Sequence, residues 1–189
     1  MRNLFFACSL LLVVTACNEY TPRPLAYPRI ERGKSDTVQY SNPRFLFSYP
    51  NNVDIIQKPA DRQGEIWLNI RYPQFHATVH CTYLPIVRRQ LADVLDDNHR
   101  LAYSHAAKAD GINQTVYSDT NEHKYGIFYD IEGHVAVPVQ FFVTDSIANF
   151  YRGSLYYDDK VNADSIAPVT DIIRQDIIYM IETLEWRNK

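Results

Sequence analysis

The stretch VQFFVTDSIANFYRGSLYY, from Val139 to Tyr157, decides the fold. Its first six residues alternate between two sets, and this period of two is typical of a β-strand. The sets are Val139, Phe141 and Val143 on one side and Gln140, Phe142 and Thr144 on the other. The polar residues 145–149 predict a turn, and the aromatic run 150–157 predicts a returning strand. The stretch therefore predicts a hairpin that buries a core, and it displays no evident reaction chemistry.

A long helical pattern follows this hairpin. After the polar residues 158–164, apolar residues recur every three or four positions, which predicts an amphipathic helix. Asp164 or Ser165 is its expected N-terminal cap. The apolar stripe consists of Ile166, Val169, Ile173, Ile177, Met180 and Leu184. This is the strongest helix signal in the chain.

The segments before the hairpin alternate between strand and helix patterns. Residues 125–131 and 135–144 predict a hairpin around Gly133, which extends the first unit into a meander. Apolar residues at Val87, Leu91, Val94, Leu95 and Leu101 predict a helix over 86–103. Further strands are predicted over 45–49, 53–57, 65–71, 75–83 and 112–117. This order favours an α+β fold, an antiparallel sheet of six or seven strands with two main helices packed on it, similar in element order to the Mog1 and PsbP sandwich.

The first 16 residues predict a lipoprotein signal peptide. Arg2 supplies a positive charge, and the apolar stretch 4–14 is too short to span a bilayer. The sequence Val14-Thr15-Ala16-Cys17 follows, and it resembles a bacterial lipobox. We therefore expect lipidation at Cys17 after cleavage before this residue. The alternatives are an ordinary secretory signal cut near Ala16 and a buried helix.

Residues 17–43 predict a lipidated stalk, and residues 44–189 predict a single α+β domain. The stalk contains four of the ten prolines of the chain, and proline favours extended backbone. Extended residues 18–42 would reach at most about 78 Å. Some stalk side chains are more apolar than a free linker requires, so we expect part of it to dock on the domain or on a partner. The candidate partner-binding residues there are Tyr27, Arg29 and Ile30.

Composition and charge exclude several classes of function. A net charge of −3 and a pI near 6.0 exclude a strongly basic nucleic-acid-binding surface. Of the three cysteines, Cys8 leaves with the signal peptide and Cys17 is acylated, so Cys81 has no intramolecular disulfide partner. Cys81 falls on the apolar side of its predicted strand. It is therefore expected to be a buried small hydrophobic residue.

Metal sites and cofactor motifs are not predicted. His76 and His80 share a strand face in the prediction, but their Cα atoms would be about 13 Å apart, too far to share a metal. The acidic loop 158–164 lacks the glycine and the bidentate glutamate of a calcium loop, and a solvated turn explains it better. Phosphate-binding loops, nucleophile elbows and HExxH motifs are also absent. We expect no cofactor, no metal and no small-molecule ligand.

Arg152 is the unexpected residue of the opening stretch. Alternation places it on one strand face with Phe150 and Tyr156. It either stacks on those rings or pairs with a carboxylate, which is a structural role, or it marks an exposed recognition patch. The structural role is favoured, and Arg152 is kept as a candidate partner-binding residue.

Short motifs along nearly the whole mature chain are similar to those of a known family. They are Tyr20-x-Pro22-x-Pro24, Tyr27-x-Arg29-Ile30, Tyr49-Pro50, Trp67-x-Asn69-Ile70, Tyr72-Pro73, Tyr83-x-Pro85-Ile86, Tyr103-x-His105, Lys108-Ala109, Tyr125-Gly126, Gln140-Phe141, Thr144-Asp145-Ser146, Arg152-Gly153, Leu155-Tyr156, Pro168-Val169 and Ile181-Glu182-Thr183 with Trp186. The set resembles the gliding-motility lipoprotein GldD family, which is associated with type IX secretion. The resemblance implies an accessory of the gliding and secretion machinery, with no established enzymatic activity and no catalytic residues.

Two classes of function follow from these observations. The first is a non-catalytic binding or assembly factor of gliding motility and type IX protein secretion, anchored in a membrane by its lipid and facing the periplasm. Its partners would be envelope components of that machinery, and the inner and the outer membrane both stay open. The alternative is a periplasmic cell-envelope hydrolase. A deep pocket that gathers His105, Asp145 and Arg152 would favour the hydrolase, and a flat aromatic surface would favour the binding factor.

Overall fold

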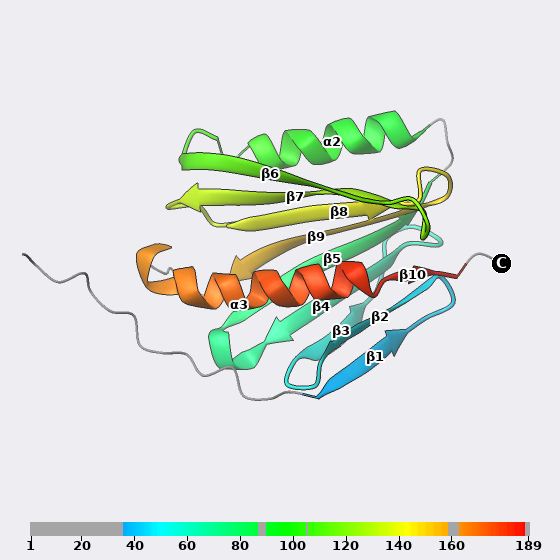
Figure 1. The fold of residues 1–189 in the computed structure, drawn as a ribbon, viewed down its shortest axis with the longest axis horizontal. Helices are drawn as coiled ribbons and strands as arrows, with labels where there is room; N and C mark the ends of the chain where they lie inside the picture. Colours follow the sequence, from blue (N-terminus) through cyan, green and yellow to red (C-terminus); the bar gives the residue numbers. More distant parts are fainter. Residues whose placement is uncertain (1–35, 87–89, 105, 159–162, 188–189) are drawn as a thin grey trace, which may run out of the picture.

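Two antiparallel sheets and two helices form the structure, a computed structural model that describes residues 36–86, 90–104, 106–158 and 163–187 (Figure 1). The larger sheet has seven strands in the order β3-β4-β5-β9-β8-β7-β6. They are β3 (Asp54–Lys58), β4 (Ile66–Tyr72), β5 (Ala77–Pro85), β6 (Ala109–Asp119), β7 (Lys124–Gly133), β8 (Val139–Thr144) and β9 (Asn149–Tyr157). The predicted α+β class is confirmed: the expected antiparallel sheet of six or seven strands has seven, and two main helices pack on it.

The smaller sheet corrects the predicted boundary between stalk and domain. It has the strand order β1-β2-β10, with β1 at Thr37–Ser41, β2 at Phe45–Pro50 and β10 at Glu185–Trp186. Strand β1 lies inside the segment predicted as stalk, so the folded domain begins no later than Thr37. The reason is tertiary: all of β1 pairs with β2, and the ring of Tyr40 packs 5.3 Å from that of Phe47. The prolines nearby concealed this strand in the sequence.

Strand β8 is the centre of the core because both of its faces are covered. All six residues of β8 are buried. Phe141 and Val143 face the main cluster, which lies between the sheet, β2 and the last helix. Phe142 faces a second cluster on the opposite side. The alternation in the sequence therefore separates two buried faces, and it does not separate a core face from a solvent face.

Helix α3 (Ala163–Glu182) covers the face of the main cluster and crosses the sheet obliquely (Figure 1). Its predicted stripe is confirmed, with Ile173 and Ile177 fully buried. Its C-terminal end is held by one hydrogen bond from β7 and one from β2. The buried Lys124 donates from Nζ to the Glu182 carbonyl at 2.7 Å, and the Ser48 N–H donates to Thr183 Oγ1 at 3.0 Å. A positive charge at the C-terminal end of a helix also interacts favourably with the helix dipole.

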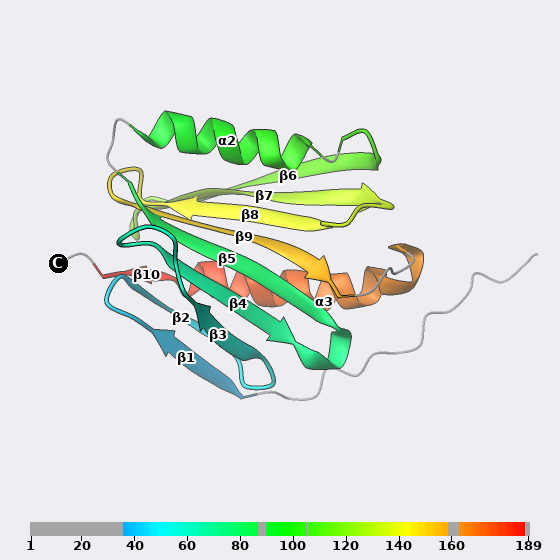
Figure 2. The ribbon, with the colours of Figure 1, turned by 180° about the vertical axis from the view of Figure 1, so that it is seen from behind.

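Helix α2 (Leu91–Tyr103) lies on the opposite face, along the β6 side of the sheet (Figure 2). Its inward stripe passes through Leu91, Leu95, Asn98 and Ala102, whose spacings of four, three and four keep them on one side. Leu101 was expected in this stripe, but it is 47% exposed because it lies about 100° around the helix from Ala102. Neither described helix lies in front of β9, β5 and β4 in Figure 2. Within the described ranges, no helix covers that half of the face beside α2.

Most predicted strands are found within a few residues of their expected ends, but His76 is placed wrongly by the prediction. The chain leaves β4 through a short 3-10 helix, η1 (Pro73–Phe75), and His76 ends it with a left-handed φ of 48°. Strand β5 therefore begins at Ala77, and His76 does not share a strand face with His80. The cause is local, because Pro73 starts a turn that the apparent alternation from residue 75 conceals. The two-residue strand β10 was also missed.

Two glycines explain two of the sequence motifs as packing constraints. A Cβ on Gly153 would lie 2.5 Å from Cε1 of Phe141 and 3.0 Å from Sγ of Cys81. A Cβ on Gly126 would lie 2.1 Å from the backbone oxygen of Phe142. Both glycines are on strands of the buried meander, where the neighbours have no free space. Close packing, and no ligand, accounts for these positions.

Replacement of Gly153 by alanine tests this packing. Gly153→Ala should reduce the free energy of unfolding by about 1–3 kcal/mol because the methyl group forces the Phe141 ring away from its site. Urea unfolding followed by tryptophan fluorescence measures the change.

The matched control is Gly111→Ala in β6, where a Cβ would lie 3.6 Å from Glu132 Oε2, an ordinary contact. We expect this variant to stay within about 1 kcal/mol of the parent, because alanine also restricts the unfolded chain. Equal stability of both variants would contradict the proposed role of Gly153.

Candidate functional site

The open half of the sheet meets α2 in a polar groove of about 400 Å³, which we call the α2 groove. Its floor comes from two rows of side chains that run across β5, β9 and β8. One row is His80, Ser154 and Gln140, and the next is Thr82 and Arg152. The wall is formed by Asn98 and Leu101 of α2 and by Ser104, which follows the helix. The volume falls within the usual range of about 300–1,000 Å³ for small-ligand sites.

Arg152 supplies the positive charge of the groove. It is half-buried on β9, and its side chain makes no hydrogen bond or ion pair with any other residue that the structure describes. Neither a carboxylate pair nor a ring stack from the described residues therefore explains its position. A partly buried guanidinium without a counter-charge is costly, and it has five N–H donors in a planar fork. This residue can bind an anion.

Neutral donors and acceptors surround Arg152. Asn98 is 3% exposed and lines the groove from α2, and its Nδ2 has no hydrogen-bond partner among the described residues. Gln140 is 5% exposed on the floor. Buried polar atoms are usually hydrogen-bonded, so an unused amide donor at the edge of a groove is informative. Among the described residues that line it, the α2 groove thus presents amide groups around the unpaired guanidinium of Arg152.

His80 forms the outer end of the floor and is held by its neighbours. Its Nδ1 lies 2.9 Å from Asn69 Oδ1, and its ring meets Tyr156 edge-on at 5.4 Å. Partial burial lowers the pKa of His80, the charge of Asp158 opposes this shift, and the charge of Lys58 adds to it. The net shift is downward, which favours the neutral imidazole.

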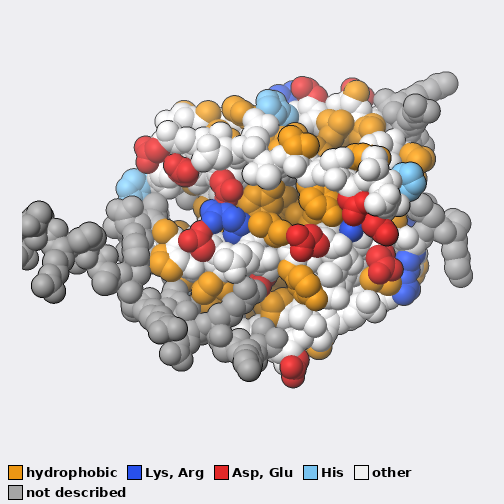
Figure 3. Space-filling model, in the orientation of Figure 1, with side chains coloured by type: hydrophobic (Ala, Val, Ile, Leu, Met, Phe, Trp, Pro, Cys, Tyr) orange, Lys and Arg blue, Asp and Glu red, His pale blue; other side chains and the backbone are white. Residues whose placement is uncertain are grey.

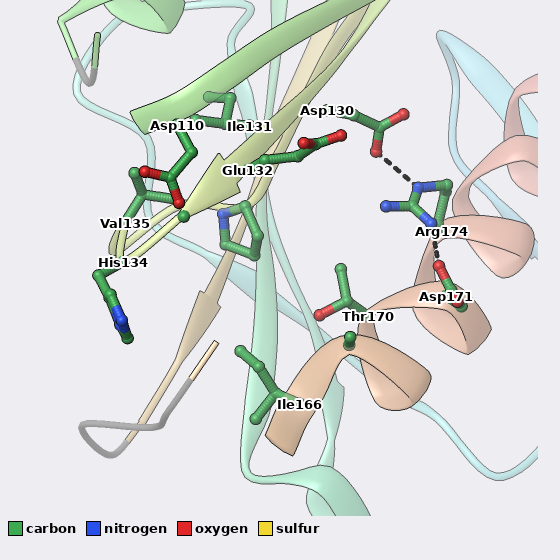
Figure 4. Close-up of a pocket in the computed structure, with 13 residues that line it drawn as sticks. Asp110, Asp130, Ile131, Glu132, His134, Val135, Ile166, Thr170, Asp171 and Arg174 are labelled. Atoms are coloured by element: carbon green, nitrogen blue, oxygen red, sulfur yellow. Dashed lines mark hydrogen bonds and ion pairs between the residues drawn. The ribbon is translucent and has the colours of Figure 1, made fainter. Parts of the chain in front are cut away.

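A second cleft, of about 340 Å³, lies on the other side of the sheet between α3 and the ends of β6 and β7 (Figure 4). Arg174 donates from Nε to Asp130 Oδ1 at 2.6 Å and also pairs with Asp171 (Figure 4). Burial alone would lower the pKa of Arg174, but these two carboxylates outweigh it and raise the pKa. The face that carries α3 shows such mixed charges beside hydrophobic side chains (Figure 3). Arg174 connects α3 to β7, and this interaction already satisfies its charge.

The turn between β8 and β9 is held by one buried carboxylate. Asp145 Oδ1 accepts from the N–H groups of Ile147, Ala148 and Asn149 at 2.8–2.9 Å, and its Oδ2 accepts from Asn149 Nδ2 at 2.6 Å. Burial would raise the pKa of Asp145, but these hydrogen bonds outweigh it and lower the pKa. Asn149 in turn accepts from the Tyr83 hydroxyl at 2.7 Å. Asp145 therefore fixes the β8–β9 turn and hence the position of β9, which carries Arg152.

Of the residues that would have indicated a hydrolase, the structure describes Asp145 and Arg152, and it does not bring these two together in the α2 groove. Asp145 is engaged in the turn and does not line the α2 groove. His105 lies outside the described residues. Cys81 is buried in the core, where burial raises the pKa of its thiol to about 12, although the neighbouring Tyr151 hydroxyl opposes the shift. The thiol is therefore protonated at neutral pH, and its role is packing.

The other predicted site residues lie outside the structure. Cys17, Tyr27, Arg29 and Ile30 belong to residues 1–35, and residues 159–162 of the acidic loop are likewise not described. The described ranges contain no group of three or more His, Cys, Asp or Glu side chains that could hold a metal ion. Within these ranges, no helix is long and apolar enough to cross a bilayer.

The sequence drew attention to Arg152 but not to the residues around it. Asn98, Gln140 and Ser154 come from α2, β8 and β9, and only the folded sheet brings them together. One signal was available for Asn98, because it occupies the inward position between Leu95 and Ala102. A polar residue at a buried helical position points to a partner or a ligand.

Replacement of Asp145 by asparagine tests the β8–β9 turn. Asp145→Asn should reduce the free energy of unfolding at pH 7 by about 2–4 kcal/mol, because an amide group replaces a carboxylate that accepts four hydrogen bonds. The folded pKa of Asp145 is lower than its ordinary value of 3.8. Its stabilising contribution is therefore present above that value and is lost as the pH falls through the folded pKa. Urea unfolding at pH 7, 5 and 3 should show the difference from the parent narrowing only at pH 3.

The control for this prediction is Asp119→Asn at the exposed turn between β6 and β7. Asp119 Oδ1 accepts from Asn121 N at 3.0 Å and from Glu122 N at 3.1 Å in a similar local geometry. We expect a loss below about 1 kcal/mol, because water replaces these bonds easily at an exposed turn. A loss at Asp145 no larger than at Asp119 would contradict the role assigned to the buried turn.

Comparisons with known proteins place the chain in a family. The solution structure of cyanobacterial PsbP (CyanoP) from Synechocystis sp. PCC 6803 is similar with a TM-score of 0.51 and 13% sequence identity, over 87% of this chain and 99% of that one. This similarity concerns the fold alone, and it confirms the expected PsbP-like arrangement. A search of curated proteins gave no match. The family described as gliding motility lipoprotein GldD matches residues 17–186. The chain therefore belongs to the gliding motility lipoprotein GldD family, and it is a membrane-anchored lipoprotein of the cell envelope associated with gliding motility.

Proposed function

We propose that this lipoprotein is a non-catalytic accessory or assembly factor of gliding motility and type IX protein secretion. The observation that carries the proposal is the family match over residues 17–186, which begins at the cysteine of the lipobox and includes the whole folded domain. The lipid attached to Cys17 would hold the domain at the membrane, facing the periplasm. Its partners would be membrane or envelope components of the same machinery.

The roles of the reactive side chains support a binding function. Asp145 fixes the β8–β9 turn, Arg174 joins α3 to β7, and the Cys81 thiol is protonated in the core. Each of these groups has a structural task, so none is free to act as an acid, a base or a nucleophile. The open face of β9, β5 and β4 beside α2 offers a surface for contact instead (Figure 2).

Acylation of Cys17 is the first test. Metabolic labelling with an alkynyl fatty acid should mark the parent protein, because the lipobox cysteine takes the acyl chains. Two or more chains give stable anchoring, at about 0.8 kcal/mol per buried methylene group. Cys17→Ala should lose the label and leave the membrane fraction, whereas Cys8→Ala is the control and should keep both. Equal labelling of the parent and Cys17→Ala would refute the anchor.

The length of the segment between Cys17 and β1 provides the second test. If the domain holds a partner at a set height above the membrane, deletion of residues 19–26 and 31–32 should reduce secretion of type IX cargo. Ten extended residues correspond to about 31 Å of reach. The deletion spares Tyr27, Arg29 and Ile30 and leaves β1 intact. Secretion is measured as cargo in the culture supernatant, with the level of the acylated protein as a control.

A second variant separates recognition from reach. Replacement of Tyr27, Arg29 and Ile30 by alanine keeps the length of the segment and removes the candidate partner-binding side chains. This variant should copurify less of a membrane component of the secretion machinery, as quantified after crosslinking in intact cells. Normal secretion and unchanged copurification in both variants would remove the case for a tethered assembly factor. An enzyme that acts on a soluble substrate would tolerate both changes.

A further inference from the structure

We propose that the α2 groove is a binding site for a carboxylate group, with Arg152 and Asn98 as its donors. The proposal goes beyond the role in secretion and does not depend on it, because it concerns a property of the folded domain that can be measured with purified protein. It rests on the free charge, the unused donor, the charge of the surroundings and the apolar rim of the groove.

The guanidinium of Arg152 carries a positive charge without a partner in the described ranges. Arg152 is half-buried between Thr82 and Phe142 in the register of the sheet, and no described residue neutralises it. Arg174 provides the contrast, since two carboxylates bind it on the other side of the sheet. A guanidinium recognises a carboxylate with two parallel N–H donors. An anionic ligand would supply the partner that Arg152 lacks among the described residues.

The amide of Asn98 offers a hydrogen-bond donor that no described residue uses. Nδ2 of Asn98 is buried without a partner, and α2 places this side chain in the wall of the groove that contains Arg152. Leaving a buried donor unsatisfied costs about 1–3 kcal/mol. A ligand oxygen in the groove would accept from Asn98 and remove this cost. The amide and the guanidinium together form a donor pair from two different elements.

The net charge of the groove favours a monoanion. Asp97 pairs with Arg100 beside the groove, so these two charges cancel. The lowered pKa of His80 favours its neutral form, and the opposite charges of Asp158 and Lys58, which both act on His80, offset each other. Among the described residues that line the groove, Arg152 therefore supplies the net positive charge. A carboxylate carries one negative charge, whereas a phosphate monoester carries about −1.5 to −2 at pH 7 and would be under-neutralised.

The rim of the groove favours an apolar group next to the carboxylate. Leu101 is 47% exposed and Tyr156 is 41% exposed, and both line the groove. Their exposed surfaces would cover a hydrocarbon or aromatic side chain of the ligand. Two sources share this chemistry, a small organic acid and the C-terminal residue of a polypeptide. The probes below distinguish them.

The test is calorimetric titration of the full-length acylated protein in non-ionic detergent. The probes are N-acetylphenylalanine, its primary amide, phenyl phosphate, and a hexapeptide ending in phenylalanine with a free or an amidated C-terminus. We expect both free carboxylates to bind saturably, with affinities at least about tenfold higher than those of their amides and of phenyl phosphate. Tighter binding of the hexapeptide assigns the site to a polypeptide C-terminus, and tighter binding of the small acid assigns it to a free acid.

Three variants connect binding to the named donors. Arg152→Gln should weaken binding of the carboxylate probes about tenfold or more, because it removes the charge while keeping an amide. Arg100→Gln is the matched control at the adjacent exposed arginine and should change the affinity less than about twofold, since this charge is already paired. Asn98→Leu should weaken binding several-fold without lowering the melting temperature, because it removes a donor that the fold does not use.

The outcomes that would overturn the proposal are specific. They are absence of saturable binding by both free carboxylates, equal affinity for acid and amide, preference for phenyl phosphate, and equal loss of affinity in Arg152→Gln and Arg100→Gln. A fall in the melting temperature of Asn98→Leu with unchanged affinity would assign Asn98 a structural role and would likewise overturn the site. Because none of these measurements involves secretion, they separate this proposal from the function in assembly.

Discussion

Burial of β8 on both faces is the constraint on which the rest of this structure depends. A strand in the middle of a sheet with two apolar faces needs a cover on each side. Helix α3 and the small sheet cover one side, and α2 covers the other. These covers differ in extent, because α2 lies along the β6 side and leaves β9, β5 and β4 open beside it (Figure 2). The α2 groove is a consequence of this unequal cover.

The carboxylate of Asp145 links this core to the groove. It organises the turn through which β8 becomes β9, and it is itself held in place by Asn149 and Tyr83. Because β9 lies between β5 and β8, the register fixed at this turn also sets Arg152 opposite Thr82 and Phe142. Asp145 thereby positions Arg152, whose side chain has no partner among the described residues. The same strand carries Gly153, whose missing side chain lets Phe141 and Cys81 pack against it.

The two arginines of the sheet faces illustrate how identical chemistry acquires different roles. Arg174 lies between Asp130 and Asp171, and its charge serves to hold α3 on β7. Among the described residues, the neighbours of Arg152 are neutral, apart from Asp97 and Arg100, which pair with each other.

The sequence by itself determined the α+β class, the meander 125–157, both long helices, the lipobox and the family, because periodicity and short motifs are local properties of a chain. It also identified Arg152 as unusual. It did not reveal β1, the two-residue β10 or the turn at His76, because nearby prolines and short lengths weaken the local pattern. In the fold, pairing with β2 stabilises the two strands, and His76 caps η1. Only the tertiary structure decided that Asn98, Gln140 and Ser154 surround Arg152. Those residues come from three elements, and the sheet register and the position of α2, which no local pattern encodes, bring them together.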